Sequence, residues 1–257
     1  MGQNQTVWLE LARIKFMGWL LPCFFLVLGT IASGPELKTV IARLEAKYHS
    51  PHTLQAAFLE RYTENGHLVR VEAGTVYFRR PGKMRWEYES PEKNLFLVDG
   101  KTAWFYVPAD HTVTRVPAKE SSDWRTPLAL LAGEMKISRV CESVRFAEQQ
   151  VPESDTNAML YCVLRGTDVK QSSNGHASDE ERKLSETGEA VYFEVVGNTG
   201  ELVRVLVKSA GGVAIEFRFT NWLSDPPVSD SLFRFAVPPG VAIVNGELPS
   251  GQNVIKP

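Results

Sequence analysis

The chain has 257 residues, enough for one large all-β domain or two smaller domains. Its 28 Lys and Arg residues against 30 Asp and Glu residues give a formal net charge of −2, and no basic stripe interleaved with aromatic residues is visible. Because phosphate binding needs clustered Lys and Arg, this composition argues against a nucleic-acid-binding protein.

The segment 1–32 is predicted to be a cleaved signal peptide. Arg13 and Lys15 precede an apolar run over 16–31, and small residues ending at Ala32 offer a cleavage site. The alternative is a membrane anchor, but a run of about 16 residues is short for a helix that spans a bilayer. We therefore expect an exported protein in the periplasm.

Cys23 tests whether the chain is anchored by a lipid instead. A lipidated cysteine should follow the apolar run behind small residues, whereas Cys23 lies inside the run. We therefore expect a soluble exported protein whose remaining part, 33–257, is a single domain.

An amphipathic helix is predicted to begin at Pro35, which suits the first helical position, behind Ser33 or Gly34 as cap. Its apolar residues recur with the spacing of one helical face, at Leu37, Val40, Ile41, Leu44 and Tyr48. Ser50-Pro51 should end it, because a residue before proline avoids the helical conformation. Such a helix is expected to cover one face of a sheet.

The rest of the chain is predicted to be mainly an antiparallel sheet. Alternating apolar and polar residues are interrupted by turn pairs such as Asn65-Gly66 and Asp99-Gly100. The expected strands are 54–63, 68–80, 83–89, 93–98, 101–107, 111–116, 136–148, 157–165, 189–196, 201–208, 213–222 and 232–237.

Large side chains share one face of two of these strands. Phe78 lies on one face of its strand, and Met84, Trp86 and Tyr88 lie on one face of the next. Such large side chains suit the wall of a cavity as well as a packed core. Arg80 shares the apolar face of its strand, where a charge is unexpected.

The segment 79–108 combines several short motifs. The residues that carry them are Arg80, Pro81, Trp86, Pro91, Asp99, Gly100, Lys101, Thr102, Trp104, Phe105, Tyr106 and Pro108. This combination resembles the signature region of the bacterial outer-membrane lipoprotein carrier (LolA) family. The resemblance continues less sharply through 126–128 and 233–241, and it covers most of the chain beyond residue 36.

The resemblance implies an open, unclosed antiparallel β-barrel, or half-barrel. An N-terminal helix and a short lid helix would cover its concave face. The side chains implied to line an acyl-binding cavity there are Phe78, Met84, Trp86, Tyr88, Trp104, Tyr106, Leu128, Leu130 and Leu131. The family is not one of enzymes, and no cofactor is implied.

The lid helix is expected over 127–132, capped by Thr126 and ended by Gly133. It is short and apolar on all sides, so it must be buried on more than one side. It is either a core plug or a lid, and the resemblance favours the lid. The resemblance also implies that Arg80 is a latch bonded to the backbone of the lid region. The alternative is an ordinary strand-end charge that reaches solvent.

Cys141 and Cys162 lie at equal distances from the centre of a predicted hairpin loop near 151–152. They can therefore sit opposite each other on neighbouring strands, and an exported protein could oxidise them. Opposed cysteines on neighbouring strands are often too poorly oriented to bridge. The sequence leaves both outcomes open.

No catalytic motif is found, and no metal site is expected. The serine hydrolase, nucleotide-binding and zinc-protease patterns are absent from the sequence. His49 and His52 have no ligand companions nearby, and Glu87 and Glu89 are expected on the wet face of a strand. We therefore expect a binding protein rather than an enzyme.

The expected function is that of a monomeric carrier of triacylated lipoproteins. The resemblance implies an ATP-driven transporter in the inner membrane as donor and an outer-membrane acceptor. One alternative is a regulatory protein of the same fold that senses lipid or lipoprotein, and another is a carrier of other lipids or glycolipids. The polar segment 168–187 is expected to be a mobile loop without an assigned role.

Overall fold

The computed structural model describes residues 36–120, 128–133, 136–165, 189–209, 211–246 and 248. The chain divides into two units, Met1–Gly34 and Pro35–Pro257, and all the described residues belong to the second. The predicted signal peptide and the predicted loop over 168–187 lie outside the described residues. In the part that the structure describes, no helix is both long and apolar enough to cross a membrane.

The described part consists mainly of strands. Its α-helices are α1 (Leu37–His49), α2 (Ala129–Ala132) and α3 (Ile137–Val140). Its strands are β1 (Thr53–Glu64), β2 (His67–Arg79), β3 (Lys83–Ser90), β4 (Leu95–Val98), β5 (Thr102–Val107), β6 (Thr112–Pro117), β7 (Cys141–Phe146), β8 (Asn157–Leu164), β9 (Glu189–Val196), β10 (Leu202–Ser209), β11 (Val213–Ser224) and β12 (Ala242–Asn245).

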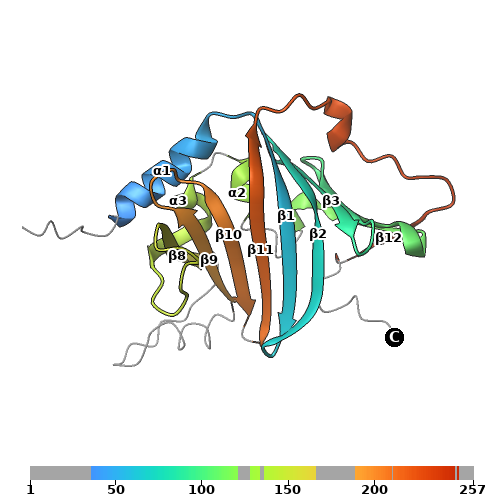
Figure 1. Ribbon diagram of the computed structural model, residues 1–257. Helices are drawn as coiled ribbons and strands as arrows, with labels where there is room; N and C mark the ends of the chain where they lie inside the picture. The colour runs from blue at the N-terminus through green and yellow to red at the C-terminus, as the bar shows by residue number, and fades with distance from the viewer. Residues whose placement is uncertain are drawn as a thin grey trace, which may run out of the picture. The chain divides into compact units, whose positions relative to one another are not determined.

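The twelve described strands form one sheet in the order β12-β6-β5-β4-β3-β2-β1-β11-β10-β9-β8-β7 (Figure 1). Neighbouring strands run antiparallel, except that β12 is parallel to β6. The two outermost strands, β12 and β7, are not paired with each other among these strands. The predicted mainly β fold with an unclosed antiparallel barrel is confirmed.

The middle of the sheet follows from alternation and one tight turn. Along β1 the side chains of Leu54, Ala56 and Phe58 are buried at every second position. Asn65 and Gly66 both have positive φ angles, 49° and 81°, which the two-residue turn between β1 and β2 requires. β1 then pairs with β2 on one side and with β11 on the other.

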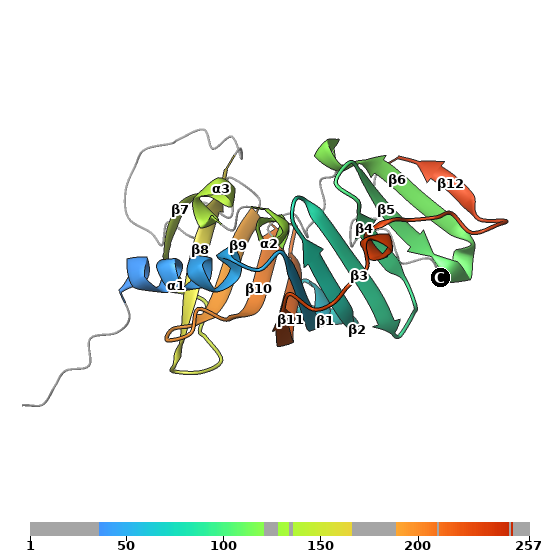
Figure 2. The ribbon, with the colours of Figure 1, turned by 90° about the horizontal axis from the view of Figure 1, so that it is seen from above.

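The sheet has two different faces. Viewed from above, it curves around α2 (Figure 2), and we call the face toward α2 the concave face. The main core lies there, between the sheet and the three helices. A smaller apolar cluster occupies the outer face, made of Met159, Tyr161, Ala190, Tyr192 and Leu206.

Helix α1 is fixed to the turn between β9 and β10. The Tyr48 hydroxyl accepts a hydrogen bond from the Leu202 N–H (2.9 Å), and the Arg43 guanidinium donates to the Gly197 carbonyl (2.6 Å). At Gly200, where φ is +75°, a Cβ atom would lie 2.3 Å from the Arg43 carbonyl oxygen. Only glycine lets the turn approach the helix this closely.

Two predicted strands are wrong in part. The predicted strand 136–148 begins as α3, because its first residues are held by tertiary contacts rather than by a ladder, and β7 begins only at Cys141. The predicted strand 232–237 does not form. A 3-10 helix occupies Asp230–Phe233, and prolines at 238–239 follow, which cannot donate to a ladder. β12 forms beyond them.

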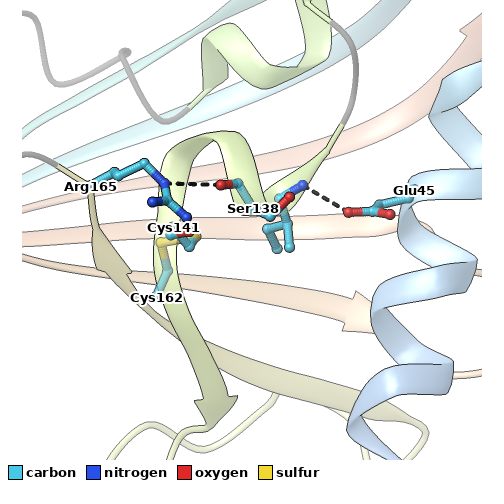
Figure 3. Close-up of a disulfide and its surroundings, with 6 residues drawn as sticks. Glu45, Ser138, Cys141, Cys162 and Arg165 are labelled. Atoms are coloured by element: carbon cyan, nitrogen blue, oxygen red, sulfur yellow. Dashed lines mark hydrogen bonds between the residues drawn. A yellow bond between two sulfur atoms is a disulfide. The ribbon is translucent and has the colours of Figure 1, made fainter.

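The structure joins Cys141 and Cys162 in a disulfide (Figure 3). The two residues are not directly opposite, because Cys141 pairs with Leu164 and Cys162 pairs with Val144. A register shift near Cys141 accounts for the diagonal placement, and the Cα atoms lie 5.4 Å apart.

Further contacts hold α3 beside the disulfide. The Arg165 guanidinium donates to the carbonyl oxygens of Ser138 (3.1 Å) and Cys141 (3.3 Å), and the Ile137 N–H donates to the Glu45 carboxylate of α1 (2.9 Å; Figure 3). The end of α3 is thereby tied to β8, and its beginning is tied to α1.

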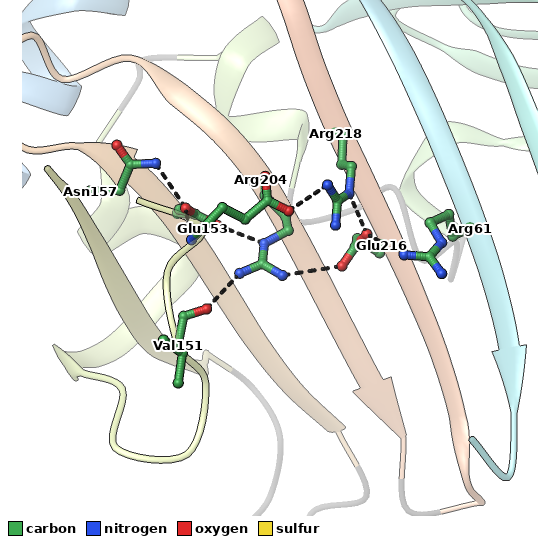
Figure 4. A network of polar contacts seen from close by, with 8 residues as sticks. Arg61, Val151, Glu153, Asn157, Arg204, Glu216 and Arg218 are labelled. Atoms are coloured by element: carbon green, nitrogen blue, oxygen red, sulfur yellow. Dashed lines mark hydrogen bonds and ion pairs between the residues drawn. The ribbon is translucent and has the colours of Figure 1, made fainter. Parts of the chain in front are cut away.

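A network of charged side chains lies on the outer face (Figure 4). The Arg204 Nε atom lies 2.7 Å from the Glu194 carboxylate, and both side chains are buried. Arg204 also contacts Glu216 (3.3 Å) and donates to the Val151 carbonyl (2.9 Å). The loop between β7 and β8 is thereby fastened over β9, β10 and β11.

The network also sets the charge state of Glu216. Burial alone would raise the pKa of this carboxyl group, but the hydrogen bond and charge of Arg218 and the charge of Arg204 lower it below the usual value. Glu216 therefore stays ionised beside Arg204 and Arg218.

Removing the disulfide should destabilise the fold. We expect the variant Cys141→Ser with Cys162→Ser to lose about 3 kcal/mol of unfolding free energy, because the bridge closes a loop with a sequence separation of 21. The measurement is urea denaturation. A reducing agent should cause the same loss in the parent protein and none in the double variant. Equal stability of the oxidised parent and the variant would refute this expectation.

Replacing Arg204 by alanine should lower the free energy of unfolding more than replacing a neighbouring arginine. Arg204→Ala leaves the Glu194 carboxylate, which is 0% exposed, without its cationic partner, and we expect a loss of about 3 kcal/mol. Arg61 lies 3.6 Å from Glu216 and its side chain is 41% exposed, so Arg61→Ala should cost less than about 1 kcal/mol. Urea denaturation at neutral pH compares the two variants. Equal losses of stability would contradict the claim that the buried ion pair of Arg204 matters more than the exposed one of Arg61.

Candidate functional site

An aromatic cluster forms the middle of the concave face. The Trp86 side chain is fully buried, and its ring lies 4.8 Å from that of Phe58 and 5.1 Å from that of Phe217. Phe78 and Met84 are cross-strand partners on the same face and are also buried. Three of the predicted cavity residues, Phe78, Met84 and Trp86, are thus brought together.

Helix α2 lies over this cluster. The side chains of Leu128, Leu130 and Leu131 are buried in the same core, and α2 contacts β2 and β3. The Gly82 N–H, in the turn between these strands, donates to the Ala132 carbonyl at the end of α2 (2.8 Å). The leucines therefore cover the aromatic cluster, while the predicted capping segment 126–127 lies outside the described residues.

Tyr88 marks the polar limit of the apolar cluster. Its ring packs against Phe58 at 5.1 Å between ring centroids, and its hydroxyl donates to the Glu60 carboxylate (2.8 Å). Glu60 follows Phe58 on the same face of β1 and is 1% exposed. Alternation along β1 places Glu60 on this face, but the sequence analysis did not single it out.

Trp104 and Tyr106 are not on the concave face. Both rings pack against Phe235, at 5.4 and 5.6 Å between ring centroids. Their neighbours Ala103 and Phe105 belong to the main core or pack against it. Both faces of β5 carry large apolar side chains, so alternation alone could not assign them, and the expectation that Trp104 and Tyr106 line the cavity is corrected.

Arg80 contacts the end of α1 rather than the lid helix. Its guanidinium donates to the carbonyl oxygens of Tyr48, His49 and Pro51, the last at 2.9 Å. Tyr48 and His49 belong to the last turn of α1, whose carbonyls have no partner within the helix, and Pro51 follows the helix. The predicted latch therefore has different acceptors from those expected, since the contacts join β2 to α1.

The surroundings of Arg80 are partly desolvated. Burial lowers the pKa of Arg80, and the charge of Asp225 opposes this effect. The Asp225 carboxylate accepts hydrogen bonds from the backbone N–H groups of His52 (2.7 Å) and Thr53 (3.0 Å). The segment between α1 and β1 is thus held by two opposite charges: Arg80 binds its carbonyl groups, and Asp225 binds its N–H groups.

A hollow of about 500 Å³ lies on the outer side of β2 and β3. It is lined by Tyr77, Arg85, Pro227, Val228, Ser229, Ser231, Leu232 and Arg234. Tyr77 and Arg85 alternate with the buried residues of their strands and so face away from the concave side. None of the predicted cavity residues lines this hollow.

In the described part of the chain, no group of three or more His, Cys, Asp or Glu side chains is placed to hold a metal ion. His49 and His52 are both exposed beside the end of α1. The concave face offers apolar contacts and a few buried polar groups.

Comparison with protein families gives a match to the family described as outer membrane lipoprotein carrier protein LolA, over residues 50–156. An outer-membrane lipoprotein carrier protein of Chromobacterium violaceum is 29% identical over 226 residues, which cover 86% of this chain and 97% of the relative. One of Nitrosospira multiformis is 34% identical over 120 residues, covering 46% of this chain and 56% of the relative. The predicted resemblance is confirmed.

Similar solved structures include a LolA superfamily protein from Nitrosomonas europaea. It has 9% sequence identity and a TM-score of 0.41, and the alignment covers 77% of this chain and 97% of that one. An uncharacterised conserved protein from Thermus thermophilus has 14% identity and a TM-score of 0.47, covering 81% and 98%.

Replacing Arg80 should loosen the end of α1. For Arg80→Leu we expect a loss of about 1.5–3 kcal/mol in unfolding free energy, because hydrogen bonds from a charged donor contribute about that much. Hydrogen exchange should speed up in the last turn of α1 and at 50–53, and stay unchanged in α2. Arg80→Lys should recover only part of the loss, because Lys lacks the planar fork of donors. Faster exchange confined to α2 would restore the lid as the partner of Arg80.

Proposed function

The chain is LolA-like over most of its length, and we propose that it is a periplasmic carrier that binds the acyl chains of lipoproteins on its concave face. It would take triacylated lipoproteins from an ATP-driven transporter in the inner membrane and deliver them to an acceptor in the outer membrane. The proposal covers export by a cleaved signal peptide and action as a monomer. The family likeness supports a binding and transport role rather than catalysis.

The burial of the α2 leucines against the aromatic cluster carries the proposal. Acyl chains and leucine side chains are chemically alike, so a chain that enters the concave face takes the place of Leu128, Leu130 and Leu131. Exposing three leucines costs about 5–9 kcal/mol. An acyl chain gains roughly 0.8 kcal/mol for each buried methylene. A bound chain must therefore bury about six to eleven methylenes before binding becomes favourable.

This competition explains how a carrier could release its cargo. Two or three acyl chains that bound an open apolar surface would be held too tightly to leave. When α2 returns to the aromatic cluster, it recovers the burial of its own leucines and offsets part of that affinity. In this proposal α2 is the lid, while Arg80 holds α1 in place beside it.

Fluorescence tests where the acyl chains bind. A fatty acid that carries a quenching group should lower the tryptophan fluorescence of the parent protein, and Trp86→Phe should remove most of the change, because Trp86 lies in the aromatic cluster. Trp104→Phe is the matched control, since Trp104 packs on the outer side against Phe235. Quenching that persists in Trp86→Phe and disappears in Trp104→Phe would place the ligand elsewhere.

A two-step assay tests the transport itself. The protein is loaded from inner-membrane vesicles supplied with ATP and then mixed with outer-membrane vesicles. Soluble complex after the first step and lipoprotein in the outer membranes after the second are expected. Loading without transfer would favour a lipid-sensing protein over a carrier.

A further inference from the structure

The concave face changes from apolar to charged at a defined position along β1 and β2, whereas β11 beside them keeps the buried Phe217 and Ile215. On β1 the row Leu54, Ala56 and Phe58 is followed by Glu60, which is cross-strand partner to Glu72 on β2. Both residues are buried: Glu60 is 1% exposed and Glu72 is 9% exposed. Buried like charges placed opposite each other are unfavourable unless other groups compensate them.

Arg70 and Tyr88 supply part of this compensation. The Arg70 Nε atom lies 2.7 Å from the Glu72 carboxylate, and its Nη2 atom lies 3.9 Å from that of Glu60. The Arg70 guanidinium also lies over the Tyr62 ring, at 5.2 Å from its centroid. Together with the hydrogen bond from Tyr88 to Glu60, these contacts define the polar end cluster: Glu60, Tyr62, Arg70, Glu72 and Tyr88.

Stability alone gives little reason for such a cluster. Buried ion pairs contribute little to stability, and well-packed apolar residues in their place are often neutral or stabilising. The polar end cluster nevertheless lies directly beyond the aromatic cluster, on the face that is proposed to hold acyl chains. The cluster extends across β1, β2 and β3, and on β1 it lies between the apolar row and the Asn65-Gly66 turn.

The apolar row has a limited length. From Leu54 to Phe58 it spans four residue steps, about 14 Å at the usual rise of an antiparallel strand. A methylene that reaches past this row meets carboxylates and a guanidinium, which it would have to desolvate without forming a hydrogen bond. A longer acyl chain therefore buries no more methylenes along β1 and β2.

We propose that the polar end cluster is an end stop that limits how much of an acyl chain the concave face can hold, and so selects cargo by acyl-chain length. This inference rests on the proposed function. Chains up to the limit gain affinity with each methylene, and longer chains gain none. The same limit keeps the total affinity low enough for the lid helix to compete.

The test measures dissociation constants of the full exported chain for saturated fatty acids of increasing length. In the parent protein the affinity should rise about four-fold per methylene, then level off. In the variant Glu60→Leu with Tyr88→Phe, which removes both partners of one hydrogen bond, the rise should continue for at least two more methylenes. Arg70 keeps its ion pair with Glu72 in this variant.

The chain offers a control pair on the opposite face of the sheet, on β2 and β3. The Thr75 hydroxyl donates to the Glu89 carboxylate (3.0 Å), and Thr75→Val with Glu89→Leu removes this equivalent pair. The control should level off at the same chain length as the parent protein. An unchanged limit in a folded Glu60→Leu/Tyr88→Phe variant, checked by circular dichroism, would overturn the end stop and leave the carrier proposal standing. Failure of every chain to bind the parent protein would overturn both.

Discussion

An open sheet with one apolar face must cover that face, and this constraint governs the rest of the structure. A closed barrel would bury its inner side chains by itself, whereas the strands β12 and β7 do not meet. The concave face is instead covered by helices, and the leucines at α2 are buried in the same core as the aromatic cluster around Trp86. A cover made of helices, unlike a closed ring of strands, can move without breaking the sheet.

The covering helices are fastened to very different extents. α1 is held by Arg80 at its last turn, by Tyr48 and Arg43 at the turn between β9 and β10, and by Glu45 at α3. Among the described residues, α2 has its leucines buried in the core, packs against β2, β3 and α3, and forms one backbone hydrogen bond to another segment, at Gly82. If one helix moves when the concave face opens, the contacts therefore favour α2, with α1 and the bridged end of α3 as the fixed frame.

The sequence predicted the sheet well and the contacts between distant segments poorly. Turn pairs such as Asn65-Gly66, together with strict alternation, fixed most strands and brought Phe78, Met84 and Trp86 together, because both signals are local. The acceptors of Arg80 were wrong because alternation gives the face of a side chain but not the segment that lies over it. Trp104 was misplaced for a related reason: its strand is apolar on both faces, and Phe235, which covers it, comes from the far end of the chain.

The buried charges on the two faces of the sheet have different physical consequences. On the outer face, Arg204 and Glu194 bind the backbone of the loop between β7 and β8, so their burial is tied to holding a segment of the chain. On the concave face, the Tyr88 hydroxyl donates to Glu60, and Arg70 contacts the carboxylates of Glu60 and Glu72 in the same sheet. These charges share a face with the aromatic cluster and begin where its apolar row on β1 ends, so their burial is explained by what they exclude, an acyl chain that would extend past Phe58.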